Sequence, residues 1–129
     1  SKDYLMKGRN KFKKLIKVII EGIEDVKGNE ISLLDLTKLE NRVCDYFIIC
    51  DGNSNTQVNA IINSVTKKVS KELKDKPWGV EGNENAEWIL LDYVDVVVHV
   101  FHNDLRDTYS LEELWSDSKD VVLEFSADE

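Results

Sequence analysis

Proline and long hydrophobic runs are almost absent from this chain of 129 residues. It contains one proline and six glycines, and 42% of its residues are hydrophobic while 33% are charged. This composition is typical of a folded globular domain and argues against a disordered tail. No apolar run approaches the roughly 20 residues that cross a bilayer, because Asp95 and His99 interrupt the most apolar stretch, residues 94–101. The charged start lacks the apolar segment of a secretory signal, so we expect no direct membrane contact.

Cysteine and histidine are scarce, with two residues of each type. Cys44 and Cys50 lie in a strand-like segment and have the surroundings of buried thiols. The cysteines and histidines show no recognisable metal-ligand spacing, so we expect no metal site and no cofactor. A reducing compartment is the simplest location, either the bacterial cytoplasm or, in a eukaryote, an organelle matrix.

The net charge of −8 conceals an asymmetry. Residues 1–20 carry seven bases and one acid, which leaves a net charge of −14 for the rest of the chain. An acidic body predicts little direct contact with nucleic acid, because phosphate binding needs clustered Lys and Arg. It suits a basic protein partner. The simplest interpretation of the basic start is a solvated helix face or an added extension.

The hydrophobic pattern predicts one domain with mixed secondary structure. Apolar residues spaced i, i+3, i+4 indicate helices, and short apolar or alternating runs indicate strands. The expected fold class is α/β (α+β), a single mixed sheet of four or five strands with helices packed mainly on one face. The expected elements are a helix over 11–27, strands over 31–37 and 45–50, a helix from 54 to 76, an extended segment over 78–82, a strand hairpin over 88–94 and 96–102, and a helix over 104–115.

The segment Asp51-Gly52-Asn53-Ser54 has two interpretations. Ser54 or Asn53 can cap the following helix. A strand, a Gly-Ser turn and a helix also begin a nucleotidyltransferase-like fold, but the segment matches neither common phosphate-binding glycine motif. A transferase needs two close carboxylates for a divalent metal, and the only nearby pair is Asp92 with Asp95.

Histidine chemistry gives no support for catalysis. His99 lies within a strand and His102 at its end. No Ser or Cys in a nucleophile-elbow context accompanies them. We therefore expect no catalytic residues, and we interpret His99 as a structural or interface residue.

The last two strands present one mixed face. Alternation places Trp88, Leu90 and Asp92 on one side of the first strand. It places Ile89, Leu91 and Tyr93 on the other side. On the second strand it separates Val97, His99 and Phe101 from Val96, Val98 and Val100. Rings beside polar groups are typical of a partner-binding surface, although Trp88 can instead pack beneath a helix.

These residues lie in blocks that together closely resemble the Iojap or ribosome-silencing-factor family. Val94 is a departure, since glycine is usual at that position, so we expect a looser turn. The resemblance covers residues 12–115, which we expect to form a ribosome-silencing-factor domain. A basic extension over 1–11 lies outside the resemblance, and an acidic tail covers 116–129. The matching blocks are Asp45–Cys50, Gly52-Asn53-Ser54 with Gln57-Val58, Val80-Glu81-Gly82, Trp88–Tyr93, Asp95–Phe101, and Arg106 with Tyr109, Leu111, Glu112, Leu114 and Trp115.

The resemblance implies a nucleotidyltransferase-like fold without transferase activity. Such a protein would bind ribosomal protein fourteen of the large subunit and obstruct the small subunit, which represses translation. The implied partner-binding residues are Trp88 and Leu90 as apolar anchors, Asp92 and Asp95 as acceptors for Lys or Arg, and Tyr93 and His99 beside them. Glu81 and Gly82 would shape the adjoining loop. Arg106 would pair with an acidic neighbour, and Trp115 would seal the last helix.

Two alternatives come from other functional classes. One is an active, metal-dependent nucleotidyltransferase that uses Gly52-Asn53-Ser54. The other is a dimerising adaptor, in which the apolar strand face forms a homodimer when the protein is free and the ribosome competes for that face.

Overall fold

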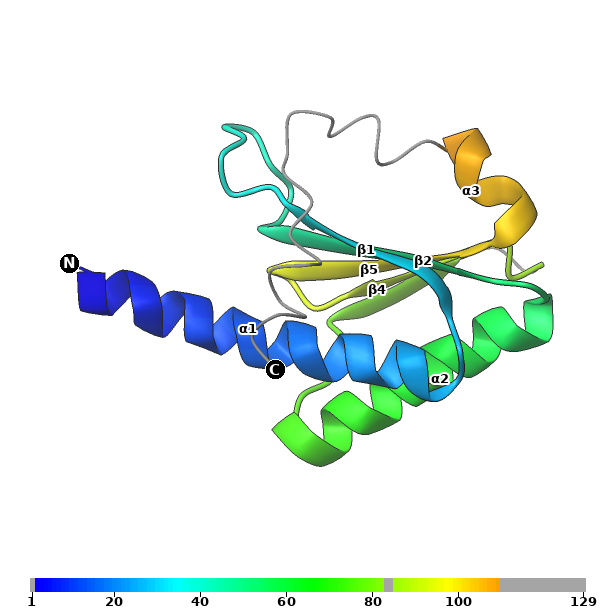
Figure 1. Ribbon diagram of the computed structural model, residues 1–129, viewed down its shortest axis with the longest axis horizontal. Coiled ribbons are helices and arrows are strands. Elements are labelled where there is room, and N and C mark those ends of the chain that lie inside the picture. Colours follow the sequence, from blue (N-terminus) through cyan, green and yellow to red (C-terminus); the bar gives the residue numbers. More distant parts are fainter. Residues whose placement is uncertain (1, 83–84, 110–129) are drawn as a thin grey trace.

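The elements of the computed structural model follow the predicted chain order (Figure 1). The structure describes residues 2–82 and 85–109, with side chains described over 12–82 and 85–106. The elements are α1 (Lys2–Asp25), β1 (Asn29–Asp35), β2 (Tyr46–Gly52), α2 (Asn55–Leu73), β3 (Gly79–Gly82), β4 (Trp88–Asp92), β5 (Val96–His102) and α3 (Asn103–Tyr109).

The five strands form one mixed sheet in the order β1-β2-β5-β4-β3. The central pair, β2 and β5, is parallel, and the other three pairs are antiparallel. β4 and β5 form the predicted hairpin. Its turn is closed by a hydrogen bond of 2.9 Å from the Tyr93 N–H to the Val96 carbonyl. The single mixed sheet of five strands, together with the helices, confirms the predicted fold class.

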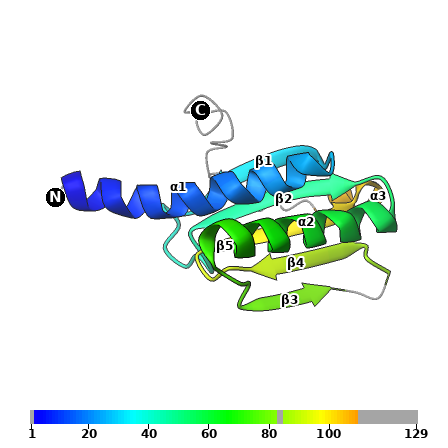
Figure 2. The same cartoon turned by 90° about the horizontal axis from the view of Figure 1, so that it is seen from below.

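Helices α1 and α2 lie side by side across one face of the sheet (Figures 1 and 2). The main core contains the apolar stripes of both helices and the inward residues of β1, β2, β4 and β5. The helices approach closely at Gly22, where an added Cβ would lie 3.0 Å from the Val65 Cα atom. The two thiols are buried, as predicted, and burial raises the pKa of Cys44 and of Cys50 to about 12.

Several element boundaries differ from the predicted ones. α1 begins at Lys2, well before the predicted residue 11, and α2 ends at Leu73, before Lys76 and Pro77. Lys74 ends α2 in the left-handed conformation with φ 54°, and its N–H donates to the Ser70 carbonyl. Ser54 caps the start of α2 as predicted, since its Oγ accepts the Gln57 N–H at 3.1 Å.

The predicted final helix is described only as far as Tyr109. Leu111, Glu112, Leu114 and Trp115, which belong to the last of the matching blocks, lie outside the described residues. Within the described part, no helix is long and apolar enough to cross a membrane.

Candidate functional site

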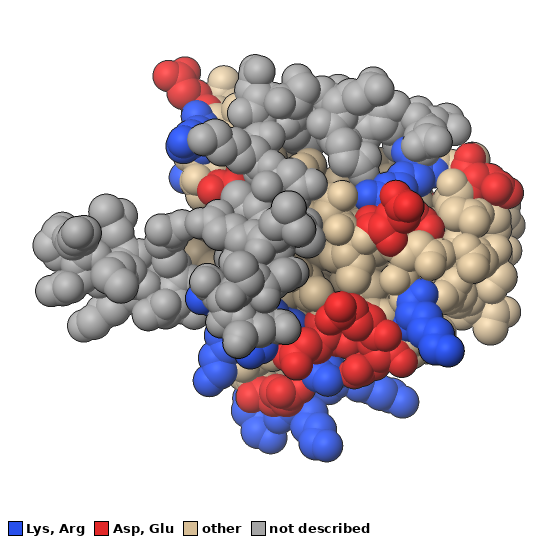
Figure 3. Space-filling model, viewed as in Figure 1, with Lys and Arg blue, Asp and Glu red and all other residues tan. Residues whose placement is uncertain are grey.

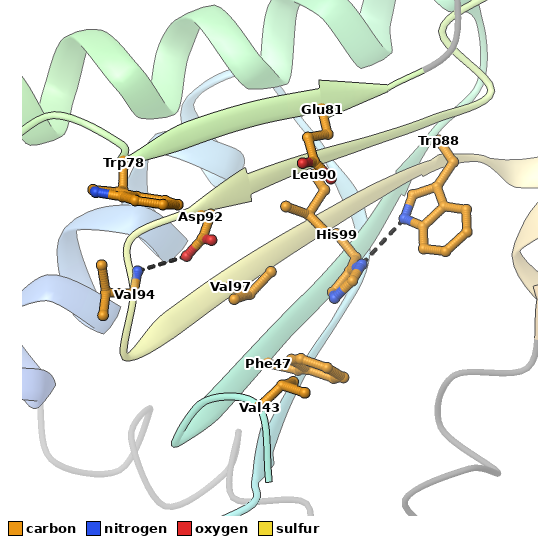
Figure 4. Close-up of a pocket in the computed structure, with 10 residues that line it drawn as sticks. All are labelled: Val43, Phe47, Trp78, Glu81, Trp88, Leu90, Asp92, Val94, Val97 and His99. Carbon is orange, nitrogen blue, oxygen red and sulfur yellow. Dashed lines mark hydrogen bonds between the residues drawn. The ribbon is translucent and has the colours of Figure 1, made fainter.

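A groove lies on the face of the sheet that α1 and α2 leave uncovered (Figure 4). It encloses about 650 Å³ and is mostly apolar. We call it the hairpin groove, because the β4–β5 hairpin supplies six of its ten described lining residues. The described lining residues are Val43, Phe47, Trp78, Glu81, Trp88, Leu90, Asp92, Val94, Val97 and His99.

Strand register brings the polar and aromatic side chains together. Leu90 of β4 pairs with His99 of β5 on one side and with Glu81 of β3 on the other. Residues two positions apart on a strand share a face, so Trp88, Leu90 and Asp92 project into the same groove. The sequence alternation therefore correctly predicts which face these three residues share.

Trp88 and His99 are fixed by aromatic packing. The Trp88 indole stacks on Phe101 with ring centroids 5.1 Å apart, and its Nε1–H donates to His99 Nδ1 at 3.1 Å. The edge-on contact between His99 and Phe47 brings their ring centroids to 4.6 Å. These contacts give the groove an ordered aromatic wall before any partner arrives.

His99 is neutral at physiological pH. The residue is only 4% exposed, and this burial lowers its pKa to about 4. Its Nδ1 accepts the Trp88 hydrogen bond, whereas its buried Nε2 has no hydrogen-bond partner within the described part of the chain. A buried polar atom without a partner is uncommon in folded proteins and needs an explanation.

The charged groups at the groove are carboxylates. Glu81 and Asp92 line it, none of the described lining residues is Lys or Arg, and no described salt bridge involves either carboxylate. Asp92 Oδ1 accepts the Val94 N–H at 2.7 Å, which holds this carboxylate in place. By contrast, both signs of charge are interspersed over the helix layer at the bottom of Figure 3. The groove therefore presents local negative charge beside apolar surface.

Large apolar side chains at the rim of the groove are exposed. Trp78 is 82% exposed, Val43 76% and Val94 56%. None of these three residues is among the site residues expected from the sequence. Trp78 comes from the loop before β3, and its N–H donates to the Asp92 carbonyl at 2.6 Å. The Pro77-Trp78-Gly79 sequence, a bulky ring in a loop, was the available signal.

The structure does not bring all of the predicted site residues to the hairpin groove. Tyr93 is buried in the core on the helix side, so the structure does not bring it to the groove. Asp95 is half-buried in the hairpin turn and is not among the described lining residues, while its carbonyl accepts the N–H groups of Asp45 and Tyr46. The remaining predicted contacts, Trp88, Leu90, Asp92 and His99, converge in the groove (Figure 4).

The two residues predicted to shape the loop have distinct positions. Glu81 lines the groove. Gly82 allows β3 to approach β4, because an added Cβ would lie 3.0 Å from the Trp88 carbonyl oxygen. Both residues also border a smaller depression of about 290 Å³ beside Trp88 and Leu90.

A second, polar cavity of about 550 Å³ lies near the start of α2. Its Asp51 carboxylate forms a buried salt bridge of 3.0 Å with Arg106, which confirms the predicted acidic partner of that arginine. The nucleotidyltransferase alternative required Asp92 and Asp95 at one metal site. Asp92 lies in the hairpin groove instead, and no metal-binding group of three or more His, Cys, Asp or Glu occurs among the described residues.

Comparison with known proteins gives consistent matches. Residues 9–129 match the family model described as ribosomal silencing factor during starvation. Ribosomal silencing factor RsfS of Halalkalibacterium halodurans is 41% identical over 110 residues, which cover 85% of this chain and 92% of that protein. A crystal structure of a Chromobacterium violaceum protein matches with a TM-score of 0.74 and 44% identity, covering 80% of this chain and 84% of that one. A mouse protein, mitochondrial assembly of ribosomal large subunit protein 1, is 34% identical over 80 residues, covering 60% of this chain and 35% of its own length.

Proposed function

The chain belongs to the ribosomal silencing factor family, and we propose that it binds the large ribosomal subunit through the hairpin groove. The family resemblance suggests ribosomal protein fourteen of that subunit as the partner. In this proposal the bound protein occupies space that the small subunit needs. It represses translation by preventing subunit association, without chemical catalysis.

The observation that carries the proposal is the chemistry of the groove. Aromatic anchors are the residues that most often dominate protein interfaces, and Trp88 and the exposed Trp78 flank one apolar surface. Glu81 and Asp92 supply negative charge at that surface, and no described lining residue neutralises it. A basic protein that also offers an apolar side chain satisfies both features.

The proposal also gives the protein a location. It acts where ribosomes are, in the bacterial cytoplasm or, for a eukaryotic source, in an organelle matrix. Homodimerisation of the free protein through the same groove stays a prediction.

Binding and obstruction are tested separately. Co-sedimentation with purified large subunits measures binding, and a sucrose gradient with both subunits measures joining. The parent protein should bind large subunits and reduce the fraction of joined ribosomes. Failure to bind would refute the proposed partner, whereas binding without any effect on joining would refute the obstruction.

Substitution of the two tryptophans tests the groove itself. Trp78→Ala should weaken binding by at least about 1 kcal/mol with little effect on folding, because the side chain is 82% exposed. Trp88→Ala should weaken it by about 2 kcal/mol or more. Val80→Ala is the control, since Val80 is 56% exposed but is not among the described groove residues. If all three variants bind as tightly as the parent protein, the groove is excluded as the contact surface.

A further inference from the structure

We infer that His99 recognises an oxygen acceptor on the partner through its Nε2–H, while its Nδ1 holds Trp88 in position for docking. The inference rests on the proposed function, namely that the hairpin groove binds a partner. It adds a chemical requirement, a carbonyl oxygen placed over the floor of the groove.

The hydrogen bond from Trp88 determines which ring nitrogen of His99 carries the proton. Indole Nε1 is only a donor, so His99 Nδ1 must be the acceptor at 3.1 Å and carries no proton. A neutral imidazole then carries its single proton on Nε2. Burial disfavours the doubly protonated ring, so this tautomer is the form present at physiological pH.

The Nε2–H donor has no hydrogen-bond partner among the residues that the structure describes. The atom is buried, although His99 lines the groove. Figure 4 shows this nitrogen on the side of the ring away from Trp88, directed toward the space between Val97 and Phe47. The donor has already lost its hydration in the free protein, so its hydrogen bond to an acceptor costs no further desolvation of the donor. Because an oxygen atom is as large as a water molecule, the acceptor reaches this nitrogen when the side chains around it shift on docking.

The neighbouring groups select the kind of acceptor. Phe47, Leu90 and Val97 surround the donor with apolar surface, which disfavours a free anion. Glu81 and Asp92 at the same groove repel a carboxylate and attract a cation. The geometry therefore favours a neutral carbonyl oxygen, from the backbone or an amide, that lies next to a Lys or Arg of the partner.

A purely structural role is the competing explanation. The edge-on contact with Phe47 can receive the N–H weakly, as an interaction with the ring face. In that case His99 would only support Trp88, and binding of a partner would leave the Nε2–H unchanged.

Two amide substitutions separate the nitrogens of His99. The side-chain oxygen of Asn can take the place of Nδ1, so His99→Asn keeps an acceptor for Trp88 and removes the Nε2 donor. The longer Gln side chain can place an amide donor near Nε2, so His99→Gln keeps the donor and removes the acceptor. We expect His99→Asn to weaken co-sedimentation with purified large subunits about tenfold, the range of a single hydrogen bond, and His99→Gln to weaken it less.

Nitrogen-15 NMR of the imidazole ring in the parent protein gives an independent readout. On addition of isolated ribosomal protein fourteen, the Hε2 proton of His99 should shift downfield and exchange more slowly with water. An unchanged Hε2 signal in the complex would overturn the inference, as would parent-like binding by His99→Asn. The NMR result decides the question even if both variants fold poorly, which thermal unfolding would reveal.

The outcomes also distinguish this inference from the proposed function. A parent protein that does not bind large subunits refutes both. A parent protein that binds while His99→Asn binds equally well refutes only the hydrogen bond from His99, and the groove remains the proposed contact surface.

Discussion

Val94 adopts a backbone conformation that β-branched residues rarely take. Its φ is +74°, and the Asp95 N–H donates to the Tyr93 carbonyl at 3.0 Å. This hydrogen bond closes a three-residue γ-turn around Val94, and γ-turns with positive φ are rare and strained. The looser turn expected at Val94 is thus a tight turn, with the strain located in the hairpin that carries the groove.

Replacement of Val94 by glycine should relieve this strain. Glycine adopts positive φ freely, and the gain exceeds the larger entropy of glycine in the unfolded chain. We expect Val94→Gly to raise the free energy of unfolding by about 1 kcal/mol, measured by urea denaturation. Val43→Gly is the matched control, because Val43 is also exposed at the groove but is not among the residues with positive φ, and it should bring no gain. A lower free energy of unfolding for Val94→Gly than for the parent protein would contradict the interpretation that Val94 strains the turn.

His99 makes stability depend on pH. Its folded-state pKa of about 4 lies below the ordinary value of 6.5, so the unfolded chain takes up the proton first as pH falls. The stabilisation is therefore complete above about pH 6.5 and declines as pH falls through about 4. We expect a loss of about 2 kcal/mol between about pH 7 and pH 5 from this residue.

The comparison with His99→Asn isolates that contribution. Asn does not titrate, while every other acidic and basic group is common to both proteins. Urea denaturation at several pH values should therefore give a flatter stability profile for the variant. Parallel profiles for the two proteins would show that folding does not lower the pKa of His99.

At the scale of elements, Arg106 fastens α3 to the sheet. Its guanidinium donates to the Asp51 carboxylate on β2 at 3.0 Å, to the Ser32 hydroxyl at 3.2 Å and to the Glu30 carbonyl on β1. Glu30 has φ 51° at an irregularity in the pairing of β1 with β2. This irregular backbone lets one arginine join three elements.

Removal of Arg106 should destabilise the protein strongly. The side chains of Arg106 and Asp51 are 11% and 6% exposed, and loss of one partner leaves a buried charge. We expect Arg106→Gln to lower the free energy of unfolding by about 3 kcal/mol. The control is Arg42→Gln, which breaks the more exposed Arg42–Asp45 pair and should change stability by at most about 1 kcal/mol. Similar losses in both variants would refute the special role of the buried pair.

The sequence predicts the order and type of these elements better than their ends. Periodicity identifies each helix and strand, but it cannot detect the left-handed Lys74 that stops α2 or the irregular pairing at Glu30. Alternation also placed Tyr93 with the core residues Ile89 and Leu91, and only the family resemblance suggested it as a contact. The structure agrees with the alternation.

The sequence predicts the part of the candidate site that the β4–β5 hairpin supplies. Trp88, Leu90, Asp92 and His99 follow from the alternation of β4 and β5. Trp78 does not, because the pairing of β3 with β4 brings this loop residue to the groove. Such pairing depends on tertiary structure, which local spacing does not encode.

At the scale of the whole molecule, charge is segregated along the chain. The first twenty residues carry a balance of +6 within a net charge of −8, so the rest is strongly acidic. An acidic body guides a basic partner over distances of about 10 Å at moderate ionic strength. This contribution acts on the rate of association more than on the rate of dissociation.

Salt should therefore slow association with large subunits. We expect the association rate to fall several-fold between low and high salt, while the dissociation rate changes little. Surface plasmon resonance measures both rates. Glu81→Gln with Asp92→Asn should weaken the salt dependence. The matched control, Glu24→Gln with Glu40→Gln, changes two exposed residues that are not among the described lining residues and should weaken it less. An association rate that does not vary with salt would exclude electrostatic guidance.

The parallel pairing of β2 with β5 also determines when the groove can form during synthesis. Tyr46 of β2 lies opposite Val96 of β5, and β5 carries Val97 and His99 on the floor of the groove. During synthesis, the middle of the sheet stays incomplete until residue 102 has been made. A prematurely terminated chain that ends at β4 lacks the strand on which both halves of the sheet assemble. Such a fragment lacks Val97 and His99 and therefore the floor of the groove, so under the proposed function we expect it not to bind large subunits.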